Sequence, residues 1–203
     1  MSIARVLCHT RGPAMFSDRV RVVIDRVDQL RDQVDDHWQI PRDEAMVLAQ
    51  LVRIGRCISI CEIGTSYGFS TLHLAAAASE HGGRVHSIDA DPKKVRAAGE
   101  SLREAGLAET VTLHEGDART VLTSLKPQAL FDFVFIDATK AQSGEYLDAV
   151  WSKLAPGCVL VTDNTTTHAE ELAPFVARLR SLPDFASCGV PVGNGFELTV
   201  RRR

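Results

Sequence analysis

The stretch E-I-G-T-S-Y-G-F-S, from Glu62 to Ser70, connects a short apolar run to a helical pattern and decides how the chain folds. Gly64 and Gly68 flank the turn between the two. Glycine lets the backbone approach a ligand closely and adopt dihedral angles that other residues avoid. The spacing is not G-x-G-x-x-G, so the fingerprint of a dinucleotide-binding turn is absent. The stretch predicts a strand, a turn and a helix in succession. The turn is either a ligand-binding turn or an ordinary connection between a strand and a helix.

Outward from this turn, short apolar runs alternate with helical patterns. Runs of strand character cover residues 57–62, 84–89, 110–115, 131–137 and 158–163. Helical patterns lie between them at 70–79, 92–104, 118–125 and 143–154. This alternation predicts parallel strands joined by helical crossovers. Several runs are apolar on both faces, as strands covered by helices on both sides should be.

The two ends of the chain add to this core. Apolar residues at helical spacing predict helices over 17–34 and 41–54, and a further helix over 169–182 that contains Pro174. The last runs, 185–190 and 196–200, are separated only by P-V-G-N-G, which predicts a hairpin. The predicted fold is α/β: a Rossmann-like doubly wound seven-stranded sheet, mostly parallel with an antiparallel C-terminal hairpin strand, and with extra N-terminal helices.

Length, composition and net charge narrow the classes of protein to which this chain can belong. The chain has 203 residues, 45% hydrophobic and 24% charged, which suits a single domain over 1–203, with N-terminal helices in 1–54 and the core in 55–203. The net charge of −3 argues against a nucleic-acid partner. No apolar run approaches the about 20 residues of a membrane span. The N-terminus lacks the apolar core of a signal peptide, so we expect a cytoplasmic protein without a membrane partner.

Five cysteines without C-x-x-C spacing or a secretory signal predict reduced thiols. Cys57 and Cys61 share one predicted strand, where about 3.3 Å per residue puts them too far apart for a disulfide. No histidine pair has metal-ligand spacing, so a zinc site is not expected. His168 is a solvated loop residue or reaches the cleft. Trp38 walls a pocket or packs between the N-terminal helices and the core.

Acidic residues end several predicted strands, where ligands bind in open α/β sheets. Glu62 ends the first strand and Asp89 the second. A carboxylate at Asp89 can accept hydrogen bonds from both ribose hydroxyls of an adenosine. Glu62 could face a zwitterionic amino acid that carries a sulfonium. Asp117 and Ala118, in E-G-D-A after the third strand, are expected near an adenine ring.

Two further strand ends carry groups suited to a cation. Asp137 ends the fourth strand in F-I-D-A-T-K, where Lys140 follows, and Asp163 and Asn164 end the fifth in V-T-D-N. Because these ends should be neighbours, they would gather two carboxylates, an amide oxygen and an ammonium. Hard oxygen ligands of this kind suit Mg²⁺. An Asp-Asn pair alone is more often a turn or helix cap, so the prediction depends on the joint placement.

Such a cleft suits methyl transfer to a hydroxyl oxygen. A phenol or catechol hydroxyl is a weak nucleophile near neutral pH, and metal coordination lowers its pKa and fixes its orientation. Lys140 could take the proton, or remain charged and only steer the oxygen, and the sequence leaves both roles open. The oxyanion would then attack the sulfonium methyl in line.

Five motifs together resemble the cation-dependent O-methyltransferases, which include catechol and caffeoyl-coenzyme A O-methyltransferases and bacterial relatives. The motifs are E-I-G-T-S-Y-G-F-S-T-L-H-L-A, I-D-A-D-P, E-G-D-A, F-D-F-V-F-I-D-A-T-K and V-T-D-N, and the resemblance spans about residues 40–200. It implies the class I methyltransferase fold, S-adenosylmethionine as cofactor, and Mg²⁺ or another divalent cation. It also implies a small hydroxylated, catechol-like substrate and a homodimer.

The resemblance also assigns roles to residues. It implies catalytic roles for Lys140 and Asp137, and metal ligation by Asp137, Asp163 and Asn164. Contacts with S-adenosylmethionine are implied for Glu62, Gly64, Thr65, Ser66, Gly68, Ser70, Asp89, Asp117, Ala118 and Asp137. Two positions depart from the catechol-specific pattern: Thr139 replaces a tryptophan, and Asn194 lies in a loop that often carries an acidic residue.

Three rival functions remain open. The missing third glycine and the terminal hairpin disfavour a nicotinamide-dependent oxidoreductase. The intact Asp137, Lys140, Asp163 and Asn164 disfavour a non-catalytic module that only binds S-adenosylmethionine. A metal-independent methyltransferase, acting on nitrogen or another small-molecule atom, would be separated from the metal-dependent enzyme by its activity in a chelator.

Overall fold

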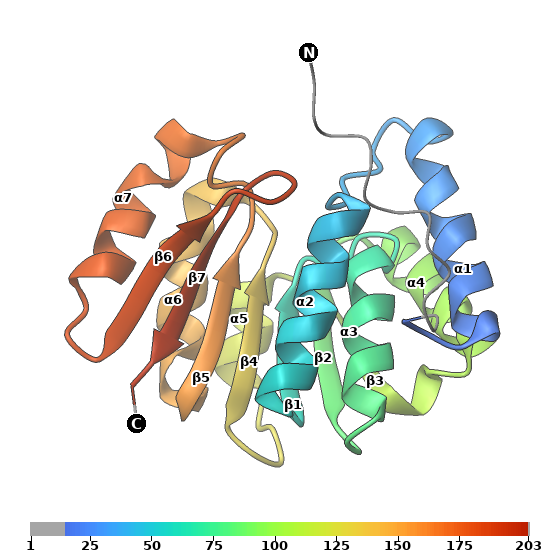
Figure 1. Ribbon diagram of the computed structural model, residues 1–203, viewed down its shortest axis with the longest axis horizontal. Helices are drawn as coiled ribbons and strands as arrows, with labels where there is room; N and C mark the ends of the chain where they lie inside the picture. Colours follow the sequence, from blue (N-terminus) through green and yellow to red (C-terminus); the bar gives the residue numbers. More distant parts are fainter. Residues whose placement is uncertain (1–14, 203) are drawn as a thin grey trace.

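A seven-stranded mixed sheet forms the centre of the computed structural model, which describes residues 15–202 (Figure 1). The strands lie in the order β3-β2-β1-β4-β5-β7-β6. Their bounds are β1 Ser59–Ile63, β2 Arg84–Asp89, β3 Val111–Glu115, β4 Phe131–Ile136, β5 Leu154–Thr162, β6 Phe185–Val190 and β7 Phe196–Arg201. β1 to β5 run parallel, whereas β7 is antiparallel to β5 and β6. The predicted sheet, with its antiparallel C-terminal hairpin, is confirmed.

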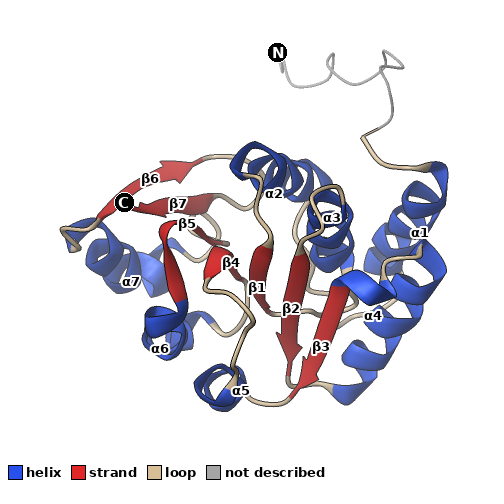
Figure 2. Ribbon diagram, turned by 90° about the horizontal axis from the view of Figure 1, so that it is seen from below, coloured by secondary structure: helices blue, strands red, loops and turns tan. Residues whose placement is uncertain are grey.

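Helices cover both faces of the sheet (Figure 2). One face packs against α2 Arg42–Gly55, α3 Phe69–Ser79 and α4 Pro92–Ala105, and α1 Asp18–Gln29 packs in turn against α3 and α4. The other packs against α5 Ala118–Ser124, α6 Ser143–Val150 and α7 Ala169–Ser181. Short 3₁₀ turns are η1 Leu30–Asp32, η2 Ala108–Thr110, η3 Lys140–Gln142 and η4 Trp151–Lys153. The predicted N-terminal helices correspond to α1, which Ser17 caps, and α2.

The start of β5 differs from the sequence prediction. The pattern placed residues 143–154 in a helix and began the strand at residue 158, whereas α6 ends at Val150 and β5 begins at Leu154. Pro156 has no backbone N–H and cannot continue a helix. Gly157 has a φ of 83°, and the pairing with β4 shifts register nearby. The strand is therefore longer than its uninterrupted apolar run and irregular at its start.

The strand order reverses between β1 and β4, which places a crevice at the carboxyl ends of these strands. Backbone hydrogen bonds hold the three ends of β1, β4 and β5 side by side. The Asp137 N–H donates to the Ile63 carbonyl at 2.8 Å, and the Asp163 N–H donates to the Ile136 carbonyl at 3.1 Å. The residues that follow β4 and β5 are thus neighbours, as predicted.

Among residues 15–202, no helix combines the length and the hydropathy that crossing a membrane would require. The four cysteines in this range are free thiols, three of them buried and Cys188 exposed. Cys8 and the N-terminal stretch considered as a signal peptide lie outside the described residues.

Candidate active site

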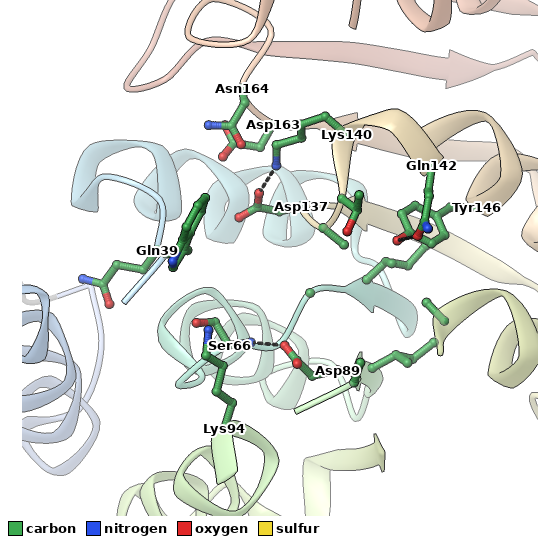
Figure 3. A pocket seen from close by; sticks show the side chains of 18 of the residues that line it. Gln39, Ser66, Asp89, Lys94, Asp137, Lys140, Gln142, Tyr146, Asp163 and Asn164 are labelled. Atoms are coloured by element: carbon green, nitrogen blue, oxygen red, sulfur yellow. Dashed lines mark hydrogen bonds and ion pairs between the residues drawn. The ribbon is translucent and has the colours of Figure 1, made fainter. Parts of the chain in front are cut away.

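A cleft of about 820 Å³ opens at the carboxyl ends of the parallel strands. Figure 3 shows Asp137, Lys140, Asp163 and Asn164 along one side of the cleft and Ser66, Asp89 and Lys94 along the other. Gly64, Asp117 and Ala118 also line it. The predicted site residues Glu62, Thr65, Gly68 and Ser70 are buried and are not among the residues that line it.

The turn after β1 depends on glycine because the ends of two strands meet there. Gly64 has a φ of 107°, and a Cβ at this position would overlap the carbonyl oxygen of Asp137. The N–H groups of Gly64 and Thr65 both donate to the Ile88 carbonyl, at 2.9 and 3.2 Å. Glycine here therefore lets the turn after β1 approach Asp137 as well as a ligand.

Asp89 is held ready to accept further hydrogen bonds. Its carboxylate accepts the N–H of Ser66 at 2.7 Å and the N–H of Asp91 at 2.9 Å. A carboxylate has about four acceptor positions, so capacity remains toward the cleft. The two backbone amides fix the orientation of the carboxylate. A carboxylate that is to accept hydrogen bonds from vicinal ribose hydroxyls needs a fixed orientation of this kind.

Replacing Asp89 with alanine should raise the dissociation constant of S-adenosylhomocysteine about 10- to 100-fold, because hydrogen bonds to a charged group contribute about 1.5–3 kcal/mol. Calorimetric titration measures this. Asp91→Ala is the matched control: Asp91 caps α4 through the Lys93 N–H at 2.8 Å and does not line the cleft. Equal affinity of Asp89→Ala and the wild type would contradict the cofactor contact expected of Asp89.

Asp117 lies in the turn between β3 and α5. Its carboxylate caps α5 by accepting the Arg119 N–H at 3.0 Å, and it pairs with the Arg119 guanidinium at 2.7 Å. This hydrogen bonding to Arg119 lowers the pKa of Asp117 to about 2. The carboxylate is paired with Arg119, and the turn formed by Gly116, Asp117 and Ala118 lines the cleft.

Glu62 lies beneath the glycine turn, fully buried on the side of α3. One carboxyl oxygen accepts the hydroxyls of Thr71 at 2.5 Å and Ser87 at 2.6 Å, and Thr65 is 2.5 Å from Ser87. The other oxygen has no partner among the described residues. Burial outweighs these hydrogen bonds and raises the pKa of Glu62 to about 7. The geometry gives Glu62 a supporting position under the turn.

This raised pKa predicts how Glu62 affects stability. Ionisation is easier in the unfolded chain, near pH 4.5, than in the folded protein, near pH 7. The stability that Glu62 contributes is therefore complete below pH 4.5 and declines by up to about 3 kcal/mol as the pH rises through 7. Glu62→Gln has no carboxyl to ionise and should lack this decline. Its free energy of unfolding in urea, relative to that of the wild type, should therefore be higher at pH 8 than at pH 5.

The exposed Glu115, at the end of β3, provides the control as Glu115→Gln. Both proteins are unfolded without cofactor and with a chelator. The difference in free energy of unfolding between Glu62→Gln and the wild type should change between pH 5 and pH 8. If this difference is the same at both pH values, the pKa of Glu62 is not raised.

Asp137 and Lys140 form an ion pair at the floor of the cleft. The Lys140 Nζ lies 2.7 Å from Asp137 Oδ1, and each side chain is 14% exposed. Burial raises the pKa of Asp137, Lys140 lowers it, and the neighbouring Asp163 raises it again. The net direction is upward, so the site concentrates negative charge that Lys140 offsets only in part.

Asp163 and Asn164 follow β5 directly beside this pair. Asp163 is 1% exposed, and its Oδ1 has no hydrogen-bond partner among the described residues. Its Oδ2 lies 3.5 Å from the Asn194 amide nitrogen. An unpartnered buried carboxylate oxygen that lines a cleft beside a second carboxylate fits a divalent cation. Within residues 15–202 no three His, Cys, Asp or Glu side chains form a metal cluster, so the donor set needs the Asn164 amide and water.

Glu44 on α2 is a residue of this site that sequence reasoning missed. It is fully buried, and its Oε2 accepts the Asn194 N–H at 3.0 Å. Burial and the adjacent Asp163 raise its pKa far above the usual value. The signal was available, because Glu44 lies four residues before Leu48, on the apolar face of the predicted second helix.

The segment of Asp36 to Gln39 closes the side of the cleft that Ser66 and Lys94 line. The Tyr67 hydroxyl donates to Asp36 at 2.9 Å, and the Lys94 Nζ donates to the Asp36 carbonyl at 2.9 Å. The His37 ring stacks on Tyr67 with centroids 4.8 Å apart. Trp38 lines the cleft and is 74% exposed, so of its two predicted roles the pocket wall is confirmed. His168 also lines the cleft and is exposed.

Known proteins share this architecture. Residues 61–165, just over half of the chain, match the family model described as a methyltransferase domain. A catechol O-methyltransferase of Niastella koreensis is 32% identical over 132 residues, which cover 64% of this chain and 59% of that relative. A caffeoyl-CoA O-methyltransferase of Mesembryanthemum crystallinum is 28% identical over 199 residues, which cover 85% of this chain and 78% of that relative.

A solved structure agrees with these relatives. The O-methyltransferase TomG from Streptomyces achromogenes, in complex with SAM, superposes with a TM-score of 0.81 at 26% identity and covers 89% of this chain and 90% of that one. The family match, the relatives and the fold agree, which excludes the nicotinamide-dependent alternative. The chain belongs to the methyltransferase-domain family and, within it, to the class I S-adenosylmethionine-dependent O-methyltransferases.

Proposed function

We propose that this enzyme transfers the methyl group of S-adenosylmethionine to a hydroxyl of a small, catechol-like acceptor with the help of a divalent cation. One observation carries the proposal: Asp137, Lys140, Asp163 and Asn164 line the same cleft as Asp89. The cofactor and a cation would therefore lie within one enclosure.

Asp137, Asp163 and Asn164 are the residues that would hold the cation. A bound Mg²⁺ supplies positive charge that lowers the pKa of an acceptor hydroxyl and fixes its direction. The unpartnered Oδ1 of Asp163 and the raised pKa of Asp137 support this donor set. The first is an acceptor without a donor, and the second shows that Lys140 offsets the repulsion between Asp137 and Asp163 only in part.

The remaining steps rest on residues of the chain itself. Lys140 contacts the acceptor oxygen and either removes its proton or stabilises the charge that develops there. Asp89 holds the ribose and the turn at Gly64 and Ser66 holds the amino-acid part, so that the methyl group faces the acceptor. Trp38 covers the cleft from the side of α2. Positioning of this kind supplies much of the rate in a displacement reaction.

The acceptor class rests on the relatives and on the lining of the cleft. The relatives include a catechol O-methyltransferase and caffeoyl-CoA O-methyltransferases. Thr139 and Asn194 line the acceptor side, where the catechol-specific pattern has tryptophan and an acidic residue. We therefore propose a vicinal diol on a scaffold other than catechol itself.

One observation favours a second candidate, a methyltransferase that needs no metal. The Lys140 ammonium already lies 2.7 Å from Asp137, and it could supply the positive charge that a cation would otherwise bring. In this alternative Lys140 alone stabilises the acceptor oxyanion.

We also propose a cytoplasmic homodimer. On the side of α2, no helix of the described chain covers the sheet surface of β5, β7 and β6 (Figure 1). Val159, Val190 and Leu198 are half-buried on this surface and Val200 is 37% exposed, which suits burial against a second copy. Light scattering on the purified protein tests this proposal. A mass of twice the 22.2 kDa of one chain supports the dimer, and the mass of a single chain rejects it.

The function is tested in two steps. Calorimetry first measures binding of S-adenosylmethionine, and a panel of vicinal diols is then assayed with Mg²⁺ and with a chelator. Methyl transfer that stops with the chelator and returns with Mg²⁺ supports the cation-dependent reaction. Equal transfer in the chelator favours the second candidate, and cofactor binding without transfer to any diol rejects the proposed acceptor class.

A further inference from the structure

We propose that Thr167 is a positioning residue that holds the Asn164 amide with its oxygen toward the cation site. The inference rests on the proposed function, because it assigns a partner to one of the proposed cation ligands. Thr167 belongs to none of the motifs that carry the family resemblance.

An asparagine ligand has a specific requirement. Only its amide oxygen can bind a cation, whereas its NH₂ group is a donor and would repel one. The two ends have nearly the same shape, so the side chain presents its oxygen reliably only where a neighbour holds the NH₂ group. Asn164 has a φ of 67°, which fixes the backbone but leaves the rotation of the amide free.

Thr167 meets this requirement. The Asn164 Nδ2 donates to Thr167 Oγ1 at 3.0 Å, which commits the NH₂ group outside the cation site and leaves Oδ1 for it. Thr167 Oγ1 also lies 3.2 Å from the His168 Nδ1. When the hydroxyl proton is donated to that nitrogen, the lone pairs of the hydroxyl face Asn164. The hydroxyl then acts as an acceptor toward the amide, as the proposal needs.

The loop around Thr167 is held by contacts that do not use its side chain. The His168 N–H donates to the Asn164 carbonyl at 2.8 Å, and the Thr165 N–H donates to the Gly195 carbonyl at 2.8 Å. The Thr166 N–H donates to the Asn194 carbonyl at 3.1 Å. Removing the Thr167 hydroxyl should therefore release the Asn164 amide without releasing the backbone.

A ligand at this position is indicated independently by Asp163. Its Oδ1 lacks a partner although the side chain is 1% exposed and lines the same cleft. A carboxylate oxygen that accepts no hydrogen bond from a donor group keeps acceptor capacity that a cation at the same site can use. Asn164 follows Asp163 directly, so an Asn164 oxygen turned to the same side would share that ligand.

The test compares isosteric variants by two readouts. Mn²⁺ binding to the S-adenosylhomocysteine complex is measured by electron paramagnetic resonance, and the Mg²⁺ dependence of turnover is measured separately. Thr167→Val should weaken Mn²⁺ binding about tenfold, the lower end of the effect of removing a partner of a metal ligand. The Mg²⁺ concentration for half-maximal rate should rise by the same factor, while kcat at saturating Mg²⁺ stays within about twofold.

Two further variants make the result specific. Thr167→Ser keeps the hydroxyl and should bind Mn²⁺ like the wild type. Thr166→Val removes the neighbouring hydroxyl and should have no effect, because within residues 15–202 the Asn164 amide donates to Thr167 and makes no hydrogen bond with the Thr166 side chain. Wild-type affinity in Thr167→Val, or equal weakening in Thr167→Ser, overturns the inference. Absence of Mn²⁺ binding by the wild type rejects the cation role itself, and with it this inference.

Discussion

Replacing Asp163 with asparagine is expected to lower kcat/KM by at least about 1000-fold, equivalent to about 4 kcal/mol of transition-state stabilisation. Asp163 is the proposed ligand with a free buried oxygen, and asparagine would offer one neutral oxygen in place of a carboxylate. The affinity for S-adenosylhomocysteine should change little, because Asp89 and the glycine turn, which are proposed to hold the cofactor, are left unchanged. Steady-state kinetics at saturating Mg²⁺ and calorimetry measure the two effects.

The stability of Asp163→Asn separates loss of function from loss of fold. Repulsion from Asp163 contributes to the raised pKa values of Asp137 and Glu44. Without metal, removing this charge should leave the melting temperature unchanged or raise it. Asp148→Asn, which removes an exposed carboxylate paired with Arg178 on the outer helices, is the control for activity. A variant of Asp163 that keeps more than a tenth of the wild-type activity would rule out a cation held by this residue.

Replacing Lys140 with methionine should lower kcat by about 100- to 10,000-fold, the range over which a positioned acid or base contributes. Methionine keeps the length of the side chain but removes both the charge and the proton acceptor. Lys140 lies 2.7 Å from Asp137 on the proposed path of the acceptor oxygen. The affinity for S-adenosylhomocysteine should stay within a few-fold of the wild type, since Lys140 lies on the acceptor side.

Lys140→Arg distinguishes the two roles of the lysine. Arginine keeps the charge but does not act as a base, because it remains protonated in proteins. If Lys140 takes the proton, arginine should be as inactive as methionine. If Lys140 only stabilises charge, arginine should restore a substantial part of kcat. Lys93→Met is the control, since Lys93 is exposed on α4 and does not line the cleft. Full activity in Lys140→Met would remove Lys140 from the reaction.

The sequence predicted the strand-end part of the site because that part depends on element order. Asp89 ends β2, Asp137 follows β4, and Asp163 follows β5. In a sheet of parallel strands joined by crossovers, the carboxyl ends of all these strands lie at one edge, whatever the packing of individual side chains. Local periodicity located the strands, so it also located these carboxylates.

Glu62 shows where the same reasoning stops. It was predicted on the cleft as the end of the first strand, but β1 continues to Ile63 and the side chain of Glu62 points to α3. Side chains alternate between the two faces of a strand, so a boundary error of one residue exchanges a ligand-facing position for a buried one. Strand boundaries are set by pairing with β2 and β4, which the local pattern does not contain.

The sequence by itself determined the α/β class, the order of the elements, the antiparallel hairpin and the strand ends that carry acidic groups, because each follows from hydrophobic period and turn chemistry within short windows. Only the tertiary structure decided which distant groups complete the site. Glu44 reaches Asn194 from 150 positions away in the chain, and Lys94 reaches Asp36 across 58. Such contacts depend on how helices pack on the sheet, and packing is a property of the whole core.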